Sequence, residues 1–155
     1  SLYREYEAVA VGVMTGGGTV NARIGRHPQD RKRQAVVESG KNAVTHYRLI
    51  QRFRGHTHIR VQLETGRTHQ IRVHMAHVRY PLVGDPVYGG RMRLPAGASP
   101  ELREALQGFR RQALHARKLG LIHPESGEYM EFEAPLAEDL SALLDVLRAD
   151  LEYER

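Results

Sequence analysis

The strongest constraint on the fold is an alternation of apolar and polar side chains through residues 43–65. Two alternating stretches, residues 43–53 and 57–65, are separated by an Arg-Gly pair, which is the pattern of a β-hairpin with one buried face. The apolar positions are Tyr47, Leu49, Ile59, Val61 and Leu63. The opposite face would then carry Arg48, Arg52, Arg60 and Gln62. We therefore expect an antiparallel pair of strands with a basic face.

After this hairpin the spacing of the apolar residues changes to that of a helix. Beyond Gly66, helical spacing separates Ile71, Met75, Val78 and Leu82. Thr68 is placed where a residue could cap the start of that helix. Residues 57–80 are therefore expected to fold as a strand, a tight turn and a helix.

The remaining segments complete a mixed fold. Residues 1–11 are strand-like, whereas residues 15–34 are rich in glycine and arginine and are expected to form a loop. Later elements are a helix over 100–109, strands over 113–123 and 129–133, and a C-terminal amphipathic helix carrying Leu140, Leu143, Leu144, Leu147 and Leu151. With no repeat and no linker, the pattern predicts a single α+β unit with a mixed, mainly antiparallel sheet and flanking helices.

The chain has 155 residues and no cysteine. A chain of this size can bury one core, so we expect one domain. Without cysteine there is no disulfide and no thiolate metal site, which favours a reducing, cytoplasmic location. No apolar run approaches the roughly 18 residues of a membrane span, so no membrane partner is expected.

Arginine dominates the charge. Lysine and arginine together number 23 against 18 acidic residues, and only Lys32, Lys41 and Lys118 are lysines. Residues 1–94 hold 16 basic and 6 acidic side chains, a net charge of +10, whereas residues 95–155 carry −5. Guanidinium groups suit phosphates and base edges, so the pattern favours an RNA or DNA partner. An arginine-rich, solvated surface with no such partner explains the charge equally well.

Other kinds of active site find little support. His56 and His58 would share a strand face, and His74 and His77 a helix face, but the sequence places no third metal ligand beside either pair. No serine lies in a nucleophile-elbow sequence. Asp85, within Gly-Asp-Pro, is interpreted as a turn residue. We therefore expect no metal site, and no catalytic acid or nucleophile stands out.

The densest polar segment is residues 63–77, LETGRTHQIRVHMAH. Helical spacing places Arg72 about one turn after His69 and away from the apolar stripe. Polar groups at a helix start behind a glycine turn can present guanidinium and backbone N–H groups to an anion. The alternative is a capped helix whose arginines are simply solvated.

The longer run over residues 65–90, TGRTHQIRVHMAHVRYPLVGDPVYGG, resembles the signature of the RluA/RluD-type RNA pseudouridine synthases. The likeness extends to Arg-Glu-Tyr-Glu-Ala at 4–8, the arginine-rich stretch 25–41, Ala-Val-Thr-His-Tyr at 43–47, LHARKLGLIHPESGE at 114–128 and FEAPL at 132–136. It covers roughly residues 4–140. The resemblance implies the pseudouridine synthase fold and isomerisation of specific uridines in large-subunit ribosomal RNA, by a monomer with no cofactor and no metal.

The resemblance also implies roles for individual residues. Tyr6 would lie against the uracil and assist removal of the proton at its C5. Arg72 would pair with a catalytic aspartate and keep it ionised. The pocket around the flipped uridine would be shaped by Arg67, His69, Gln70 and Leu114, within an arginine-lined face spanning residues 4–93.

One part of the family pattern is absent. The family's aspartate lies in a His-Arg-Leu-Asp motif upstream of the tyrosine strand, and residues 1–155 contain no such motif. We therefore expect this chain to be the C-terminal portion of a catalytic domain, inactive alone and with an apolar sheet edge and face exposed. The alternatives are a non-catalytic, arginine-rich RNA-binding module and, more remotely, a partner-binding domain that uses the C-terminal leucine stripe.

Overall fold

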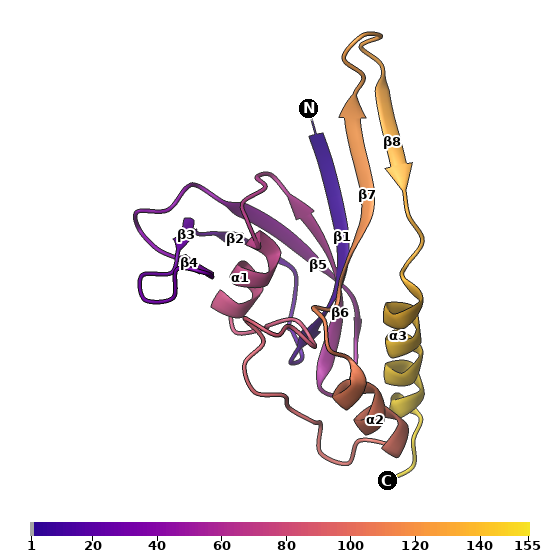
Figure 1. The fold of residues 1–155 in the computed structure, drawn as a ribbon. Helices are drawn as coiled ribbons and strands as arrows, with labels where there is room; N and C mark the ends of the chain where they lie inside the picture. Colours follow the sequence, from indigo (N-terminus) through magenta and orange to yellow (C-terminus); the bar gives the residue numbers. More distant parts are fainter. Residues whose placement is uncertain (1) are drawn as a thin grey trace.

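A six-stranded antiparallel sheet forms the centre of the structure, a computed structural model that describes residues 2–155 (Figure 1). Its strands lie in the order β2, β5, β6, β1, β7, β8. They are β1 (Leu2–Val11), β2 (Gly18–Asn21), β5 (Val44–Arg52), β6 (His56–Leu63), β7 (Leu114–Ile122) and β8 (Tyr129–Glu133). The other elements are the two-stranded sheet of β3 (Ile24–Arg26) and β4 (Gln34–Val36), and the helices α1 (Gln70–His77), α2 (Pro100–Gly108) and α3 (Glu138–Leu151).

The predicted hairpin, the later strands and all three helices are confirmed. The prediction of a loop over residues 15–34 is wrong, because this segment contains β2, β3 and the start of β4. Three- and four-residue strands leave too few positions for an alternating pattern to be seen. They form here because β2 pairs with the first four residues of β5, and β3 pairs with β4.

Two apolar cores lie on opposite faces of the sheet, because successive side chains of a strand point to opposite sides. On β1, Ala8 and Ala10 pack with Ile71 and Met75 of α1, whereas Val9 packs with α2 and α3. The second core takes in Leu140, Leu143, Leu144 and Leu147 of the leucine stripe. That stripe is therefore internal, except for Leu151, which is 39% exposed.

The predicted basic face of the hairpin needs one correction. Arg48 and Arg60 pair across β5 and β6, on the face that carries α3. A register shift between Leu49 and Gln51 turns the rest of β5 over, so that Arg52 reaches the opposite face and donates to the carbonyl oxygens of Met14 and Thr15. A one-residue bulge exchanges the two faces of a strand, and the sequence carries no signal for it.

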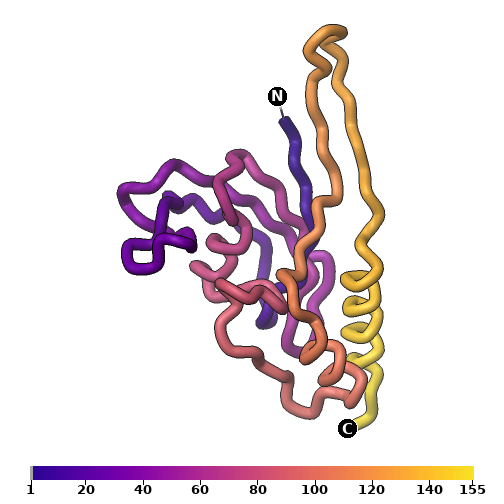
Figure 2. Tube along the Cα trace, viewed as in Figure 1, coloured from indigo at the N-terminus to yellow at the C-terminus, as the bar shows by residue number. Residues whose placement is uncertain are grey.

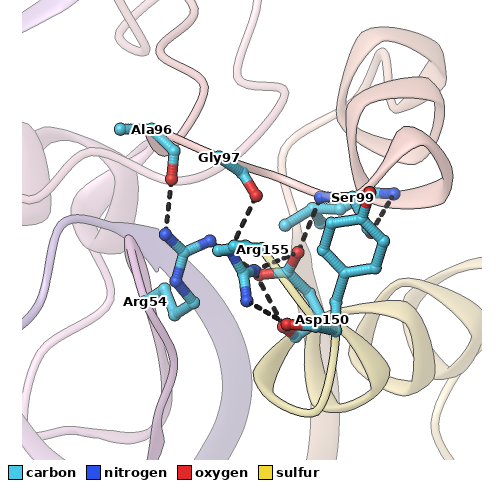
Figure 3. A network of polar contacts seen from close by, with 8 residues as sticks. Arg54, Ala96, Gly97, Ser99, Asp150 and Arg155 are labelled. Atoms are coloured by element: carbon cyan, nitrogen blue, oxygen red, sulfur yellow. Dashed lines mark hydrogen bonds and ion pairs between the residues drawn. The ribbon is translucent and has the colours of Figure 1, made fainter.

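A buried carboxylate fastens the C-terminal end of α3 to the segment before α2 (Figure 3). Asp150 is 2% exposed, accepts the backbone N–H of Ser99 at 2.8 Å, and pairs with Arg155 at 2.8 Å and with Arg54 at 3.5 Å. Ser99 in turn caps α2 by accepting the N–H of Leu102. Three separate stretches of chain therefore meet at one aspartate.

The hairpin of β7 and β8 projects past the other strands together with the start of β1 (Figures 1 and 2). Leu2, Phe132 and Tyr129 are each at least 50% exposed there. Pairing of Leu2 with Leu121 and of Leu119 with Phe132 places those four side chains on one face of the sheet. These side chains form an exposed apolar face at this end of the sheet, and its burial by a further part of the protein stays a prediction.

None of the helices among residues 2–155 is both long enough and apolar enough to cross a bilayer. In the same residues, no three His, Asp or Glu side chains gather closely enough to hold a metal ion.

Three histidines are buried: His56, His58 and His74. Burial lowers the pKa of each, and lowers that of His56 to about 4, where nearby Arg93 adds to the effect and Asp150 opposes it. The folded pKa of His56 is thus below its ordinary value of 6.5. Between these two values the unfolded chain binds more protons than the folded chain.

The free energy of unfolding should therefore fall as the pH is lowered from 6.5 towards 4. For His56 alone the loss is about 3 kcal/mol, at about 1.36 kcal/mol per pKa unit. Urea unfolding at a series of pH values measures it. His56→Gln should lower the slope of this profile by about one proton between pH 4 and 6.5. Equal profiles for wild type and His56→Gln would contradict the assignment.

Candidate active site

A cavity of ≈ 320 Å³ lies between β1, the start of α1 and the residues that lead into β7. All six residues singled out from the sequence line it: Tyr6, Arg67, His69, Gln70, Arg72 and Leu114. The remaining lining residues are Arg4, Leu63, Gly66, Ile71 and Gln112. Side chains that are 108 positions apart in the sequence, Tyr6 and Leu114, therefore meet at one surface hollow.

Tyr6 reaches the cavity because of its place in β1. It pairs with Val61 of β6 and Ala116 of β7, at a register shift in the β1–β7 ladder. Its neighbours Glu5 and Glu7 point to the opposite face, where Glu7 binds His58 and Arg117. The half-buried Tyr6 ring thus packs against the core under α1, and one side of it is left to the cavity.

The start of α1 is built differently from the prediction, and Thr68 as its cap is wrong. The cap position is His69, which has a left-handed backbone (φ 56°) and makes no side-chain capping bond. The turn is held by Gln70, whose Oε1 accepts from the Thr65 hydroxyl and the Arg67 N–H. The Gln70 amide therefore stabilises the turn that precedes α1.

Gln70 has a structural place as well as a place in the cavity wall. Its Nε2 donates to the Val44 carbonyl oxygen at 3.0 Å and to the Thr45 hydroxyl at 2.9 Å. Both ends of its amide are therefore occupied within the chain, and the side chain is 3% exposed. Gln70 joins α1 to β5 and holds the cavity wall in place.

The central feature of the site is a buried ion pair between Arg72 and Asp85. Arg72 donates from Nε to Oδ2 of Asp85 at 2.8 Å and from Nη2 to Oδ1 at 3.0 Å. Oδ1 also accepts the backbone N–H groups of Val87 and Tyr88, both at 2.9 Å. The two side chains are 10% and 1% exposed. A buried guanidinium that donates two hydrogen bonds to one carboxylate has a fixed orientation.

The pKa values of the pair follow from this geometry. Burial alone would raise the pKa of Asp85, but the hydrogen bonds from Arg72, Tyr88 and Val87 outweigh it and hold the pKa below the ordinary value. The hydrogen bonds that Arg72 donates to Asp85 raise the pKa of Arg72. Both groups therefore stay charged at neutral pH.

The Tyr88 ring packs against the Arg72 guanidinium. Its ring centroid lies 5.0 Å from the Arg72 guanidinium and 5.2 Å from that of Arg33, distances at which a cation is attracted by an aromatic ring. Its hydroxyl accepts the N–H of Gln34 and is 2.8 Å from Nδ1 of His69. Burial, and then the charge of Arg72, lower the pKa of His69, so this ring is neutral at pH 7.

Asp85 and Tyr88 are the residues that sequence reasoning missed. Asp85 does form the expected turn, through its hydrogen bonds with Val87 and Tyr88. Its bond with Arg72 joins residues 13 positions apart, and no periodic pattern in the sequence predicts that pairing. The available signal was the Gly-Asp-Pro-Val-Tyr-Gly sequence itself. This sequence combines a carboxylate, an aromatic ring and two glycines within a basic segment. That combination is also consistent with a partner for a nearby arginine.

The cavity is electropositive. Arg4, Arg67 and Arg72 line it, and among residues 2–155 no aspartate or glutamate does. Arg67 is anchored by its Nε, which donates to the carbonyl oxygen of Asn42. A Cβ at position 66 would meet the Arg4 guanidinium, so a larger residue there would displace the Arg4 side chain. The hairpin residues Arg48 and Arg60 lie on the other face of the sheet, so they do not belong to this site. The prediction of one continuous arginine-lined face is therefore wrong for these two residues.

The chain is similar to proteins of known family. A family model described as RNA pseudouridylate synthase matches residues 1–77. The chain is 60% identical over 152 residues to ribosomal large subunit pseudouridine synthase D of Pseudomonas aeruginosa and to that of Escherichia coli K12, covering 98% of this chain and 48% and 47% of those proteins. The chain thus spans about half the length of the curated relatives it matches.

Solved structures give the same result for the fold. Human RNA pseudouridylate synthase domain containing 4 superposes with a TM-score of 0.71 at 25% identity, over 95% of this chain and 62% of the human one. Human RNA pseudouridylate synthase domain containing 1 superposes with a TM-score of 0.68 at 23% identity, over 96% and 66%. The family resemblance inferred from the sequence is confirmed, and the chain belongs to the RNA pseudouridylate synthase family.

Proposed function

We propose that this chain forms the C-terminal portion of the catalytic domain of an RNA pseudouridine synthase that isomerises uridines in large-subunit ribosomal RNA. The observation that carries the proposal is the cavity that brings Tyr6, Arg72 and Leu114 together among unpaired guanidinium groups. In the reaction the N1–C1′ bond of a uridine breaks and a C5–C1′ bond forms. The C5 proton leaves and N1 takes up a proton, so the uridine is rearranged without a cofactor.

The uracil would lie between the Tyr6 ring and the apolar Leu114 side chain. To enter the cavity the nucleotide must leave its stack, which costs a few kcal/mol that aromatic and guanidinium contacts offset. The Tyr6 hydroxyl would assist removal of the C5 proton. Arg4 and Arg67 would bind the flanking phosphates, since both lie at the cavity without a carboxylate partner in residues 2–155.

Arg72 would hold the catalytic aspartate, which would have to come from outside residues 1–155. Asp85 occupies Nε and Nη2 of the guanidinium, and Nη1 has no partner among residues 2–155. Nη1 is therefore available to a second carboxylate at the cavity. Because a nearby positive charge favours the ionised form, Arg72 would keep that aspartate ready to attack.

The proposal predicts that this chain alone is inactive and becomes active when the missing part is supplied. A chimera would carry this chain in place of the matching 152 residues of the Pseudomonas aeruginosa relative. Tritium release from [5-³H]uridine in large-subunit ribosomal RNA measures turnover. We expect release by the chimera and none by the chain alone. A chimera that binds the RNA but never releases tritium would instead support a non-catalytic RNA-binding module.

The same proposal includes the binding partner, the oligomeric state and the cellular location. Ribosomal RNA is the partner, the enzyme acts as a monomer, and a ribosomal substrate places it in the cytoplasm. Sedimentation of the active chimera with and without RNA tests the monomer, because a dimer at assay concentration would contradict it.

A further inference from the structure

A second cavity lies apart from the candidate active site, between the segment that follows α1 and helix α2. Its volume is ≈ 310 Å³, at the small end of the range for ligand pockets. Figure 2 shows that segment arching away from the sheet before it reaches α2. The cavity is lined by apolar side chains that include Val11, Leu82, Leu106 and Phe109.

Three arginines surround this apolar cavity: Arg91, Arg93 and Arg110. All three are exposed, and none forms a salt bridge or donates a side-chain hydrogen bond within residues 2–155. Seven other arginines of the chain do have carboxylate partners. The one acidic residue in the lining, Asp85, is already neutralised by Arg72. The cavity therefore carries uncompensated positive charge.

A buried polar side chain in the wall lacks a partner. His56 lines the cavity and is 2% exposed, and its Nδ1 is buried without a hydrogen bond in residues 2–155. An imidazole in such a position normally has its nitrogens bonded. At neutral pH this ring is uncharged, so it can form a single neutral hydrogen bond with a nucleobase.

We propose that this second cavity binds one unpaired nucleotide of single-stranded RNA, with its base against Phe109 and His56 and its phosphate between Arg93 and Arg110. Bases stack on aromatic rings and on guanidinium planes, and both are present here. The choice of RNA as the ligand rests on the proposed function.

The two cavities are connected through the buried ion pair. Asp85 lines the second cavity, while its carboxylate holds Arg72, which lines the first. A nucleotide bound in the second cavity would thus contact the turn that orients Arg72. The second cavity would select the RNA by a nucleotide other than the target uridine.

The test is a titration of this chain with uridine, cytidine, adenosine and guanosine 5′-monophosphates, followed by ¹⁵N–¹H NMR. At least one nucleotide should give saturable shifts at His56, Val83 and Phe109. Inorganic phosphate should bind more weakly and should not shift the His56 ring. If phosphate reproduces both the shifts and the Kd, the cavity is a simple anion site and the proposal fails. No shift at His56 with any nucleotide would overturn it as well.

Variants locate the binding and include a matched control. Arg93→Gln and Arg110→Gln should each weaken nucleotide binding by roughly threefold to tenfold. Arg103→Gln removes the same charge from an exposed, unpaired arginine of α2 that does not line the cavity, and should change the Kd by less than about twofold. An equal loss for all three would mean that binding is non-specific electrostatics. Because the arginines are exposed, these variants keep the test valid even if His56→Gln does not fold.

This experiment is independent of turnover. If the chimera releases tritium but nucleotides leave His56 unshifted, the inference fails and the proposed function stands. If nucleotides bind at His56 but the chimera releases no tritium, the proposed function fails and the second site stands.

Discussion

Replacing Arg72 by glutamine is expected to lower turnover of the chimera by about 10²–10³-fold, the usual effect of removing one preorganised donor to a reacting anion. Asp85 holds the guanidinium of Arg72 by two hydrogen bonds at the cavity wall, so its charge is in place without any cost of reorganisation during the reaction. Glutamine cannot supply that fixed positive charge. The measurement is tritium release under single-turnover conditions, with RNA affinity determined separately.

The control for this prediction is Arg79→Gln. Arg79 is exposed, lies just after α1 and has no salt bridge within residues 2–155, so its replacement removes the same charge from a position outside the cavity. We expect turnover within about twofold of wild type. Arg72→Lys keeps the charge but loses the paired bonds, and should recover little of the activity. An Arg72→Gln chimera that retains a tenth of the wild-type rate would refute the role given to Arg72.

Much of the fold could be predicted because its long elements carry periodic patterns. The alternation over 43–65 and the leucine spacing from Leu140 reflect which face is buried, and burial supplies most of the stabilising free energy. The short strands β2, β3 and β4 have no such pattern, and the bulge before Gln51 depends on the neighbouring strand rather than on local residues. These features are set by tertiary contacts.

The candidate site divides in the same way. Helical spacing placed Arg72 one turn after His69, but the roles of the site residues came from the family motif. The six residues meet at one cavity: Tyr6, Arg67, His69, Gln70, Arg72 and Leu114. The pairing of Arg72 with Asp85 could not be predicted, because it depends on how the turn after Pro81 folds back against α1. Backbone bonds of Val83 to Val9 and Ala113 direct that turn. A residue that looks like a turn former can thus also be the partner of a buried charge.

The last prediction concerns that buried pair. Asp85→Asn should lower the free energy of unfolding of this chain by about 3–5 kcal/mol, because it leaves the Arg72 guanidinium buried without a counter-charge. The asparagine side-chain oxygen can still accept the N–H groups of Val87 and Tyr88, so the turn itself is kept. The loss therefore measures the ion pair and not the turn. Urea unfolding followed by circular dichroism provides the number.

The chain contains its own matched control. Arg111 and Asp139 form the same two-bond pair, with Nε–Oδ2 and Nη2–Oδ1 distances of 2.7 Å, but their side chains are 40% and 50% exposed. Water and salt screen such a pair, so Asp139→Asn should cost no more than about 1 kcal/mol. Equal losses for the two variants would show that burial does not set the strength of the Arg72–Asp85 pair. A large difference would show that the orientation of Arg72 depends on a carboxylate that the solvent cannot replace.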